Sequence, residues 1–230
     1  MNVIGHRLLI VTAHPDDESF LAAGTMWKNS EAHGKNYVFC ATLGERGKAH
    51  FKKPVTKTAL KRIRKRELML VSKKLGVARV KIGNLPDGEV SQSKYKIIFR
   101  KKLLAYIESV KPDLILGFGR DGISGHRDHI AAGEIAEKAS KKFRIPYLAF
   151  CMSPMLQKYQ HHLQNRRKHG VYKNTPPLET PDIVIRIDKE HKLNTLCLHK
   201  SQHDNGNPFW GLPKSVANAH LRAEYFAVRT

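Results

Sequence analysis

Residues 8–18 read Leu-Leu-Ile-Val-Thr-Ala-His-Pro-Asp-Asp-Glu, and this stretch decides the fold. The apolar run from Leu8 to Val11 is typical of a buried strand, and Pro15 does not continue it because proline lacks the backbone donor of a sheet ladder. One imidazole and three carboxyl groups therefore follow the carboxyl end of a strand. In open α/β sheets ligands bind at that edge, between the loops that leave the strands. Such a cluster indicates a metal site or proton chemistry.

Strand-like and helix-like segments alternate along the chain. After the run 7–12, further apolar runs of strand length lie at 37–42, 79–83, 113–118, 147–151 and 183–187. Between most of them apolar residues recur at helical spacing: Leu21, Ala22, Thr25 and Met26, then Leu68, Val71 and Leu75, then Ile97, Ile98, Leu104, Ala105 and Ile107. This alternation predicts a mostly parallel sheet covered by helices.

Length and composition favour one domain. A chain of 230 residues with 41% hydrophobic content can bury one sizeable core. We expect a single domain over residues 1–230, without internal repeats. Residues 44–58 and 157–181 are polar and rich in Gly, Pro, Lys and His, which predicts two long loops.

The chain is strongly basic, with 41 Lys plus Arg against 20 Asp plus Glu and a net charge of +21. That charge attracts any polyanion, whether nucleic acid, a membrane surface or a phosphorylated metabolite. Eight of the fifteen residues from Lys52 to Arg66 are Lys or Arg, but Phe51 is the one aromatic residue beside them that could stack on a base. A solvated helix face is therefore favoured, and a nucleic-acid-binding protein is the rival from another functional class.

Cysteine usage and hydropathy indicate a cytoplasmic protein. Cys40, Cys151 and Cys197 are odd in number and far apart, which favours reduced thiols over a disulfide framework. There is no basic segment followed by an apolar one at the N-terminus, and no apolar run approaches the roughly 20 residues of a membrane helix. We expect a soluble intracellular chain, and the sequence does not predict its oligomeric state.

A second polar cluster, Gly125-His126-Arg127-Asp128-His129, follows the strand 113–118 through a glycine-rich loop. A helical pattern comes next, so His126 and His129 should share one face at a helix start. Two clusters at one sheet edge can converge on one ion, and two His with a carboxylate and a water are a ligand set of catalytic zinc. A second carboxylate could take the proton of that water. Spacing alone does not tell which of Asp16 and Asp17 would bind the ion and which would take the proton.

Each cluster also has a simpler interpretation. An Asp-Asp pair after a strand is commonly an N-cap with a solvated neighbour, and His-x-x-His is commonly two partly exposed histidines. Their joint occurrence, each after an apolar strand and in a Gly or Pro turn, favours the site. The remaining histidines have no carboxylate at ligand spacing, and we expect most to lie on the surface: His161, His162, His169, His191, His199, His203 and His220.

The two clusters together resemble the paired signature of the PIG-L/LmbE-like zinc-dependent N-deacetylases. Further segments are similar to the family's motifs in the same order: Thr42-Leu43-Gly44-Glu45-Arg46-Gly47, Arg64-Lys65-Arg66-Glu67 with Leu75-Gly76-Val77, Leu85-Pro86-Asp87-Gly88, and Lys192 to Gln202 ending in His199-Lys200-Ser201-Gln202. The resemblance extends over about residues 8–202. Arg127 stands where the family often has proline, which adds a positive charge and leaves the expected ligands unchanged.

The resemblance implies a single Rossmann-like, three-layer domain with its active site at the carboxyl edge of the strands. The implied metal ligands are His14, Asp17 and His129, and the ion is Zn²⁺, although Fe²⁺ or Co²⁺ can take the same donors. Asp16 would then be the general base.

Further roles follow from the same resemblance. His126 would stabilise the oxyanion or protonate the leaving amine, Asp128 would orient a histidine, and Arg64 would reach the substrate. Glu18 remains a supporting or helix-start carboxylate, and His199 lies in a segment that the family places near its core.

The implied reaction is hydrolysis of an N-acetyl group on an N-acetylglucosamine-type sugar conjugate, with acetate and a free amine as products. The conjugate can carry an anionic aglycone. The alternative among enzymes is an amidase that acts on a larger sugar conjugate with a different acyl group.

Overall fold

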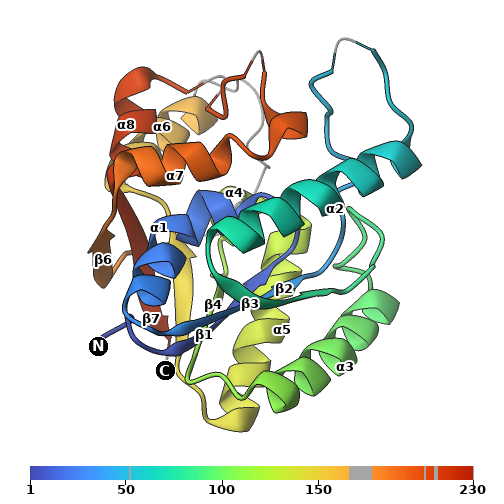
Figure 1. Cartoon of the computed structure of the whole chain (residues 1–230), viewed down its shortest axis with the longest axis vertical. Helices are drawn as coiled ribbons and strands as arrows, with labels where there is room; N and C mark the ends of the chain where they lie inside the picture. Colours follow the sequence, from blue (N-terminus) through green and yellow to red (C-terminus); the bar gives the residue numbers. More distant parts are fainter. Residues whose placement is uncertain (52, 166–177, 205, 210–211, 230) are drawn as a thin grey trace.

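A seven-stranded sheet forms the centre of the molecule (Figure 1), in the order β3-β2-β1-β4-β5-β7-β6. The strands of this computed structural model are β1 (Arg7–Thr12), β2 (Lys35–Cys40), β3 (Val77–Ile82), β4 (Leu114–Phe118), β5 (Tyr147–Cys151), β6 (Ile183–Arg186) and β7 (Ala223–Arg229). The structure describes the whole chain except residues 52, 166–177, 205, 210–211 and 230. From β3 to β5 all neighbours are parallel, whereas β7 pairs antiparallel with both β5 and β6.

Helices cover both faces of this sheet (Figure 1). The longer ones are α1 (Asp17–Glu31), α2 (Lys57–Lys74), α3 (Ser93–Val110), α5 (Arg127–Phe143) and α6 (Pro154–Asn165), and the shorter ones are α4 (Gly122–Gly125), α7 (Lys189–Leu196), η1 (Lys200–Gln202) and α8 (Lys214–Arg222). α3 contacts α5 on one side, while α7 contacts both α1 and α2 on the other side. The predicted three-layer α/β fold with a mostly parallel sheet is confirmed.

Two central strands bring the distant polar clusters together. β1 pairs in parallel with β4, so Leu8 lies opposite Leu114 although the two are about a hundred residues apart in the chain. β4 is buried from end to end and β1 from Leu8 onward, as expected for strands covered on both faces. Because the chain order reverses between β1 and β4, this is the switch point at which such sheets bind ligands.

Three local predictions were wrong. The loop expected over 157–181 begins as helix α6, because Pro154 suits a first helical turn and the Ser153 hydroxyl accepts the Leu156 N–H at 3.2 Å. Strand β7 was missed altogether. Ile97 and Ile98 do not belong to the buried face of α3, which is formed instead by Phe99, Leu103, Tyr106, Ile107 and Val110.

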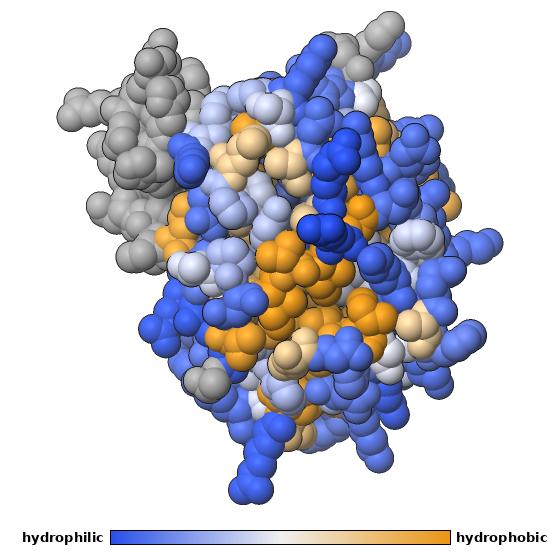
Figure 2. Space-filling model, turned by 90° about the vertical axis from the view of Figure 1, so that its left-hand side faces the viewer, coloured by the Kyte–Doolittle hydropathy of each residue, from blue (hydrophilic) through white to orange (hydrophobic). Residues whose placement is uncertain are grey.

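The face shown in Figure 2 is mostly hydrophilic, with an apolar patch near its centre. Exposed apolar side chains of the antiparallel strands include Val184 and Val228. Of the helices described, none is long and apolar enough to cross a bilayer.

Candidate active site

The side chain of Asp17 stabilises the turn between β1 and α1 by accepting backbone hydrogen bonds. One carboxylate oxygen of Asp17 accepts the N–H groups of His14, at 2.8 Å, and of Ala13, at 3.1 Å. Asp16 occupies the N-cap position of α1 but its side chain does not cap the helix. Its backbone is left-handed instead, with φ 109°, a conformation that L-residues rarely adopt.

The structure brings the three predicted metal ligands together. His14 Nδ1 lies 3.1 Å from His129 Nε2, and His129 Nε2 lies 3.3 Å from Asp17 Oδ1. His14 Nδ1 lies 3.7 Å from Asp17 Oδ2. Ligands of a tetrahedral zinc ion, at bond lengths of about 2.0–2.1 Å, are separated by roughly 3.3 Å, so this spacing suits such an ion.

Oxygen atoms lie close to the far nitrogens of both imidazoles. His14 Nε2 lies 3.1 Å from Asp87 Oδ1 and 3.4 Å from Asp128 Oδ2, and His129 Nδ1 lies 3.0 Å from the Gly122 carbonyl. If those nitrogens carry the protons, the lone pairs of His14 Nδ1 and His129 Nε2 point at the same place. Two facing lone pairs repel each other unless a cation lies between them, so the donor set fits a metal ion.

The electrostatics of the cluster also favour positive charge. Burial lowers the pKa of His14, but Asp128, Asp87 and Asp17 raise it more, with a net rise to about 10. Burial raises the pKa of Asp17, but His129 and His14 outweigh it and hold that pKa well below its usual range. A buried site that stabilises an imidazolium also stabilises a divalent cation.

Asp87 is a site residue that sequence reasoning missed. Asp128 is fully buried and accepts the Gly88 N–H at 2.7 Å and the Val90 N–H at 3.0 Å, which holds the loop after β3 against His14. Asp87 and Asp128 therefore both face His14 Nε2. This contact agrees with the predicted orienting role of Asp128. The one available signal for Asp87 was its place in the motif from Leu85 to Gly88.

The surroundings of His126 specify one tautomer. Burial lowers its pKa to about 4, aided by His129 and His14, so the ring is neutral near pH 7. His126 Nδ1 accepts the Asp128 N–H at 3.2 Å, which leaves the ring proton on Nε2. The ring packs edge-on against His14, with 4.8 Å between centroids. A neutral imidazole of this kind can donate to an oxygen that gains negative charge.

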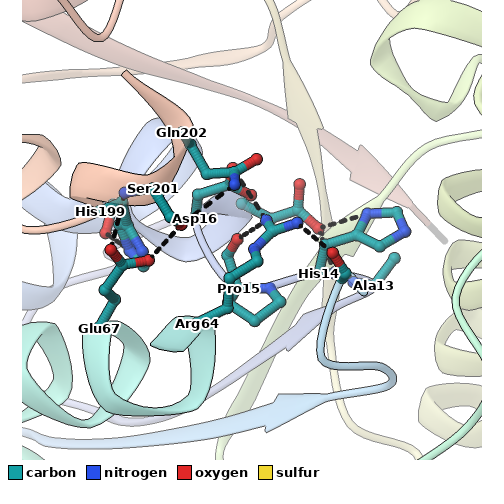
Figure 3. Close-up of polar contacts among 12 residues, drawn as sticks. Ala13, His14, Pro15, Asp16, Arg64, Glu67, His199, Ser201 and Gln202 are labelled. Carbon is teal, nitrogen blue, oxygen red and sulfur yellow. Dashed lines mark hydrogen bonds and ion pairs between the residues drawn. The ribbon is translucent and has the colours of Figure 1, made fainter. Parts of the chain in front are cut away.

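Arg64 lies beside Asp16. Its side chain is buried, 3% exposed, and lies 3.2 Å from Asp16 Oδ2 (Figure 3). It also donates to the carbonyls of Gly44, at 2.9 Å, and Pro15. Gly44 has a positive φ, and a Cβ there would overlap the guanidinium. These contacts favour a role in placing Asp16, and substrate binding by Arg64 stays a prediction.

A cavity of about 400 Å³ opens beside these residues. Part of its wall is formed by residues of the two polar clusters, namely Asp16, Asp17 and His129. The rest is divided between polar side chains (Lys48, His50, Ser124, His199, Gln202 and His203) and apolar ones (Phe20, Leu21, Ile123, Met152, Leu196 and Pro208). The cavity can therefore receive a molecule with both polar and apolar parts.

We expected most histidines from His161 onward to lie on the surface. That expectation is wrong for His199, His203 and His220, which are buried. His199 Nε2 lies 2.8 Å from Glu18 Oε1, a partner 181 residues away in the chain. The side chains of His161, His162 and His169 lie outside the described part of the molecule.

Comparison with known families identifies the chain. The model of the PIG-L family, described as GlcNAc-PI de-N-acetylase, matches residues 9–140, which include both polar clusters and more than half of the chain. The chain belongs to the PIG-L family. The family resemblance seen in the motifs is thereby confirmed.

A PIG-L relative from Bacillus subtilis, a probable N-acetyl-alpha-D-glucosaminyl L-malate deacetylase 2, is 32% identical over 204 residues. The match covers 85% of this chain and 83% of the relative.

Solved structures with the same fold include N,N'-diacetylchitobiose deacetylase from Pyrococcus horikoshii, with a TM-score of 0.66, 19% identity, and coverage of 97% of this chain and 83% of that one. A 4-carboxy-2-hydroxymuconate hydratase from Pseudomonas putida is as similar, with a TM-score of 0.67, 16% identity, and coverage of 97% and 95%. At such identities the likeness concerns the fold, and the fold hosts more than one reaction.

Proposed function

We propose that this protein is a metal-dependent hydrolase that removes the N-acetyl group from an N-acetylglucosamine conjugate and releases acetate and a free amine. One observation carries the proposal: His14 Nδ1 and His129 Nε2 lie 3.1 Å apart and converge with the Asp17 carboxylate, next to Asp16 and at the wall of a cavity. Family membership supports the reaction class, because the B. subtilis relative is named as a deacetylase of this substrate type.

The metal would be held by His14, Asp17 and His129. Zinc is the ion we propose, and Fe²⁺ or Co²⁺ suit the same two imidazoles and carboxylate. When bound, such an ion supplies a Lewis acid that polarises the amide carbonyl and acidifies a water molecule. Asp87 and Asp128 would fix the His14 ring with Nδ1 toward the ion.

The remaining steps belong to groups of the chain. Asp16 lines the cavity and would accept the proton of the attacking water. His126 would donate its Nε2 proton toward the developing oxyanion or the leaving nitrogen. Arg64 would keep the Asp16 carboxylate in place.

The sugar conjugate would carry an anionic group. Lys48, His50 and His203 lie in the cavity wall, and the carboxylates of that wall are those of Asp16 and Asp17. An aglycone with a carboxylate or phosphate would therefore meet the Lys48 ammonium and imidazole donors in the same wall.

A second candidate keeps the site and changes the acyl group. The apolar part of the cavity wall, which includes Phe20, Met152 and Leu196, can receive a chain longer than acetyl. An amidase that acts on a larger conjugate would use that surface.

The test is acetate release from a panel of neutral and phosphorylated N-acetylglucosamine conjugates, with bound metal measured and with or without a chelator. We expect metal-dependent release, highest with anionic conjugates, and matched N-octanoyl substrates in the panel test the second candidate. Release that is insensitive to chelator, or no release by the metal-loaded protein, would contradict the proposal.

Two variants separate the base from the ligands. Asp16→Asn should keep the metal, because all three ligands remain, and lower kcat by about 100-fold or more, in the range of general-base losses. His129→Ala should lose both metal and activity. An Asp16→Asn protein with bound metal and a wild-type rate would show that Asp16 is not the base.

A further inference from the structure

Glu18 and His199 form a buried pair that the proposed reaction does not use. Glu18 is 0% exposed and His199 is 1% exposed. Glu18 Oε1 lies 2.8 Å from His199 Nε2 and also accepts the Ser19 hydroxyl at 2.8 Å. The other carboxylate oxygen, Oε2, accepts the backbone N–H of Asp16 at 3.0 Å.

Through this bond the Glu18–His199 pair contacts Asp16, whose backbone is strained. Asp16 has φ 109° and ψ −28°, and its side chain does not cap α1. A non-glycine residue keeps such a conformation only where its surroundings over-determine it. The bond from the Asp16 N–H to Glu18 is one such restraint, and the contact of Arg64 with the Asp16 carboxylate is another.

His199 can support this restraint because the segment that carries it is held by α2 through Ser201. Glu67 accepts the Ser201 N–H at 2.7 Å and the Ser201 hydroxyl at 2.6 Å (Figure 3). Arg64 and Glu67 are three residues apart and share one face of α2. One helix face thus holds Asp16 directly through Arg64 and holds the segment of His199 through Glu67.

The charge of the pair suits a firm contact. Burial lowers the pKa of His199, but Glu18, Asp16 and Glu67 raise it more, so the net shift is upward. A carboxylate that accepts from an imidazole N–H, a hydroxyl and a backbone N–H at once has little freedom to rotate.

We infer that Glu18 and His199 are positioning residues: they hold the backbone of Asp16 in its left-handed conformation, so that the Asp16 carboxylate stays in the cavity wall beside the metal ligands. This inference rests on the proposed function in one respect, since it takes Asp16 as the general base. Neither side chain takes or gives a proton in the reaction.

Two substitutions of His199 separate this role from direct contact with a ligand. The amide of His199→Gln can place a donor near the position of Nε2, and that of His199→Asn near the position of Nδ1. If His199 acts through Glu18, His199→Gln should stay within about threefold of the wild-type kcat, whereas His199→Asn and Glu18→Ala should lower kcat by about 10- to 100-fold. KM and metal content should change little. If His199→Asn is the more active of the two, His199 acts through Nδ1 and the inference is wrong.

His191 provides the matched control, because it lies on α7, directly before the segment of His199, and packs on α1, where it stacks on Trp27 with 4.2 Å between centroids. His191→Asn should leave kcat unchanged. Glu18→Gln replaces Glu18→Ala if the latter does not fold, with a smaller expected loss because its amide oxygen can still accept from Asp16.

A readout independent of turnover is the amide proton resonance of Asp16 in the metal-loaded protein. It should lie downfield in the wild type, as for an N–H bonded to a carboxylate, and move upfield in Glu18→Ala and His199→Asn but not in His191→Asn. An unmoved resonance in Glu18→Ala would overturn the inference. If the resonance moves as expected but the wild type releases no acetate, the proposed function fails while the positioning contact stands.

Discussion

Asp16 combines a left-handed backbone with a carboxyl group surrounded by other carboxylates. Residues in sparsely populated φ/ψ regions cost about 1–3 kcal/mol each. Burial raises the pKa of Asp16, Asp17 and Glu18 raise it too, and Arg64 and His199 lower it, with a net rise. A carboxyl group with a raised pKa is suited to accept a proton near neutral pH.

The contact between Arg64 and Asp16 predicts a change in the pH profile. The base must be ionised, so kcat falls as pH drops through the pKa of Asp16. Arg64 lowers that pKa, hence Arg64→Gln should move the acid limb to higher pH, by about one pH unit for a close opposite charge. Lys61→Gln is the control from the same helix, since Lys61 lies 3.8 Å from Glu45 and makes a more exposed pair. Equal acid limbs in wild type and Arg64→Gln would show that Arg64 does not act on the base.

Gly44 predicts a second way to displace Arg64. Gly44→Ala introduces a Cβ that overlaps the guanidinium and strains a residue at φ +65°. Gly5→Ala carries the same backbone cost, because Gly5 has φ +88°, but its Cβ would meet no atom within 4 Å. We expect both to lose about 1 kcal/mol of unfolding free energy from the backbone. Gly44→Ala alone should lower kcat on the acid side of the pH profile, because it displaces Arg64 from Asp16. An equal kcat for the two alanine variants would contradict this.

The sequence predicts the site residues that follow strands, but not those that meet only through the packing of helices and loops. His14, Asp17 and His129 follow strands, and parallel strands end at one edge, so their convergence could be predicted. The pairing of Glu18 with His199 depends on how α7 and η1 pack on α1 and α2, and no local pattern reports that contact. Asp87 reaches His14 through a loop whose position depends on its hydrogen bonds to Asp128.

At the scale of elements, the parallel half of the sheet was predictable and the antiparallel half was not. Each strand from β1 to β5 has a strand-like run with a helix after it, which is the pattern of a parallel sheet, although the run of β3 is interrupted by Arg79 and Lys81. β7 contains Glu224, which is fully buried and interrupts the apolar face of the strand. The Glu224 carboxylate accepts from Thr25 N–H at 2.7 Å and receives Lys192 Nζ at 2.9 Å, so β7 connects α1 to α7.

This connection predicts a strong stability effect. Lys192 and Glu224 are both 0% exposed, so Lys192→Met leaves a buried carboxylate without its cation. We expect a loss of about 3–5 kcal/mol in the free energy of unfolding by urea. Adding Glu224→Gln to Lys192→Met removes the unpaired charge and should recover at least about 1 kcal/mol. Additive losses in the double variant would mean that the two side chains are not coupled.

At the scale of the whole molecule, charge is unevenly distributed. The chain carries +21, whereas the site gathers Asp16, Asp17, Asp87 and Asp128. On α2, the exposed side chains of Arg62, Lys65, Arg66 and Lys73 form a groove with Met69 and Leu70, with no aromatic side chain in that groove to stack on a base. The basic surface therefore fits general attraction of anions better than recognition of a nucleic acid.

That attraction predicts a salt effect which depends on the substrate. A net positive field raises the local concentration of anionic molecules, and salt screens it over about 10 Å at 0.1 M ionic strength. For phosphorylated N-acetylglucosamine conjugates, kcat/KM should fall by roughly 3- to 10-fold between low and physiological salt, while neutral conjugates should change less than about twofold. The measurement uses both substrates with one metal-loaded preparation, so that loss of metal or of fold would affect them equally. An equal fall for both would mean that salt acts on the protein itself and that its surface charge does not guide the substrate to the cavity.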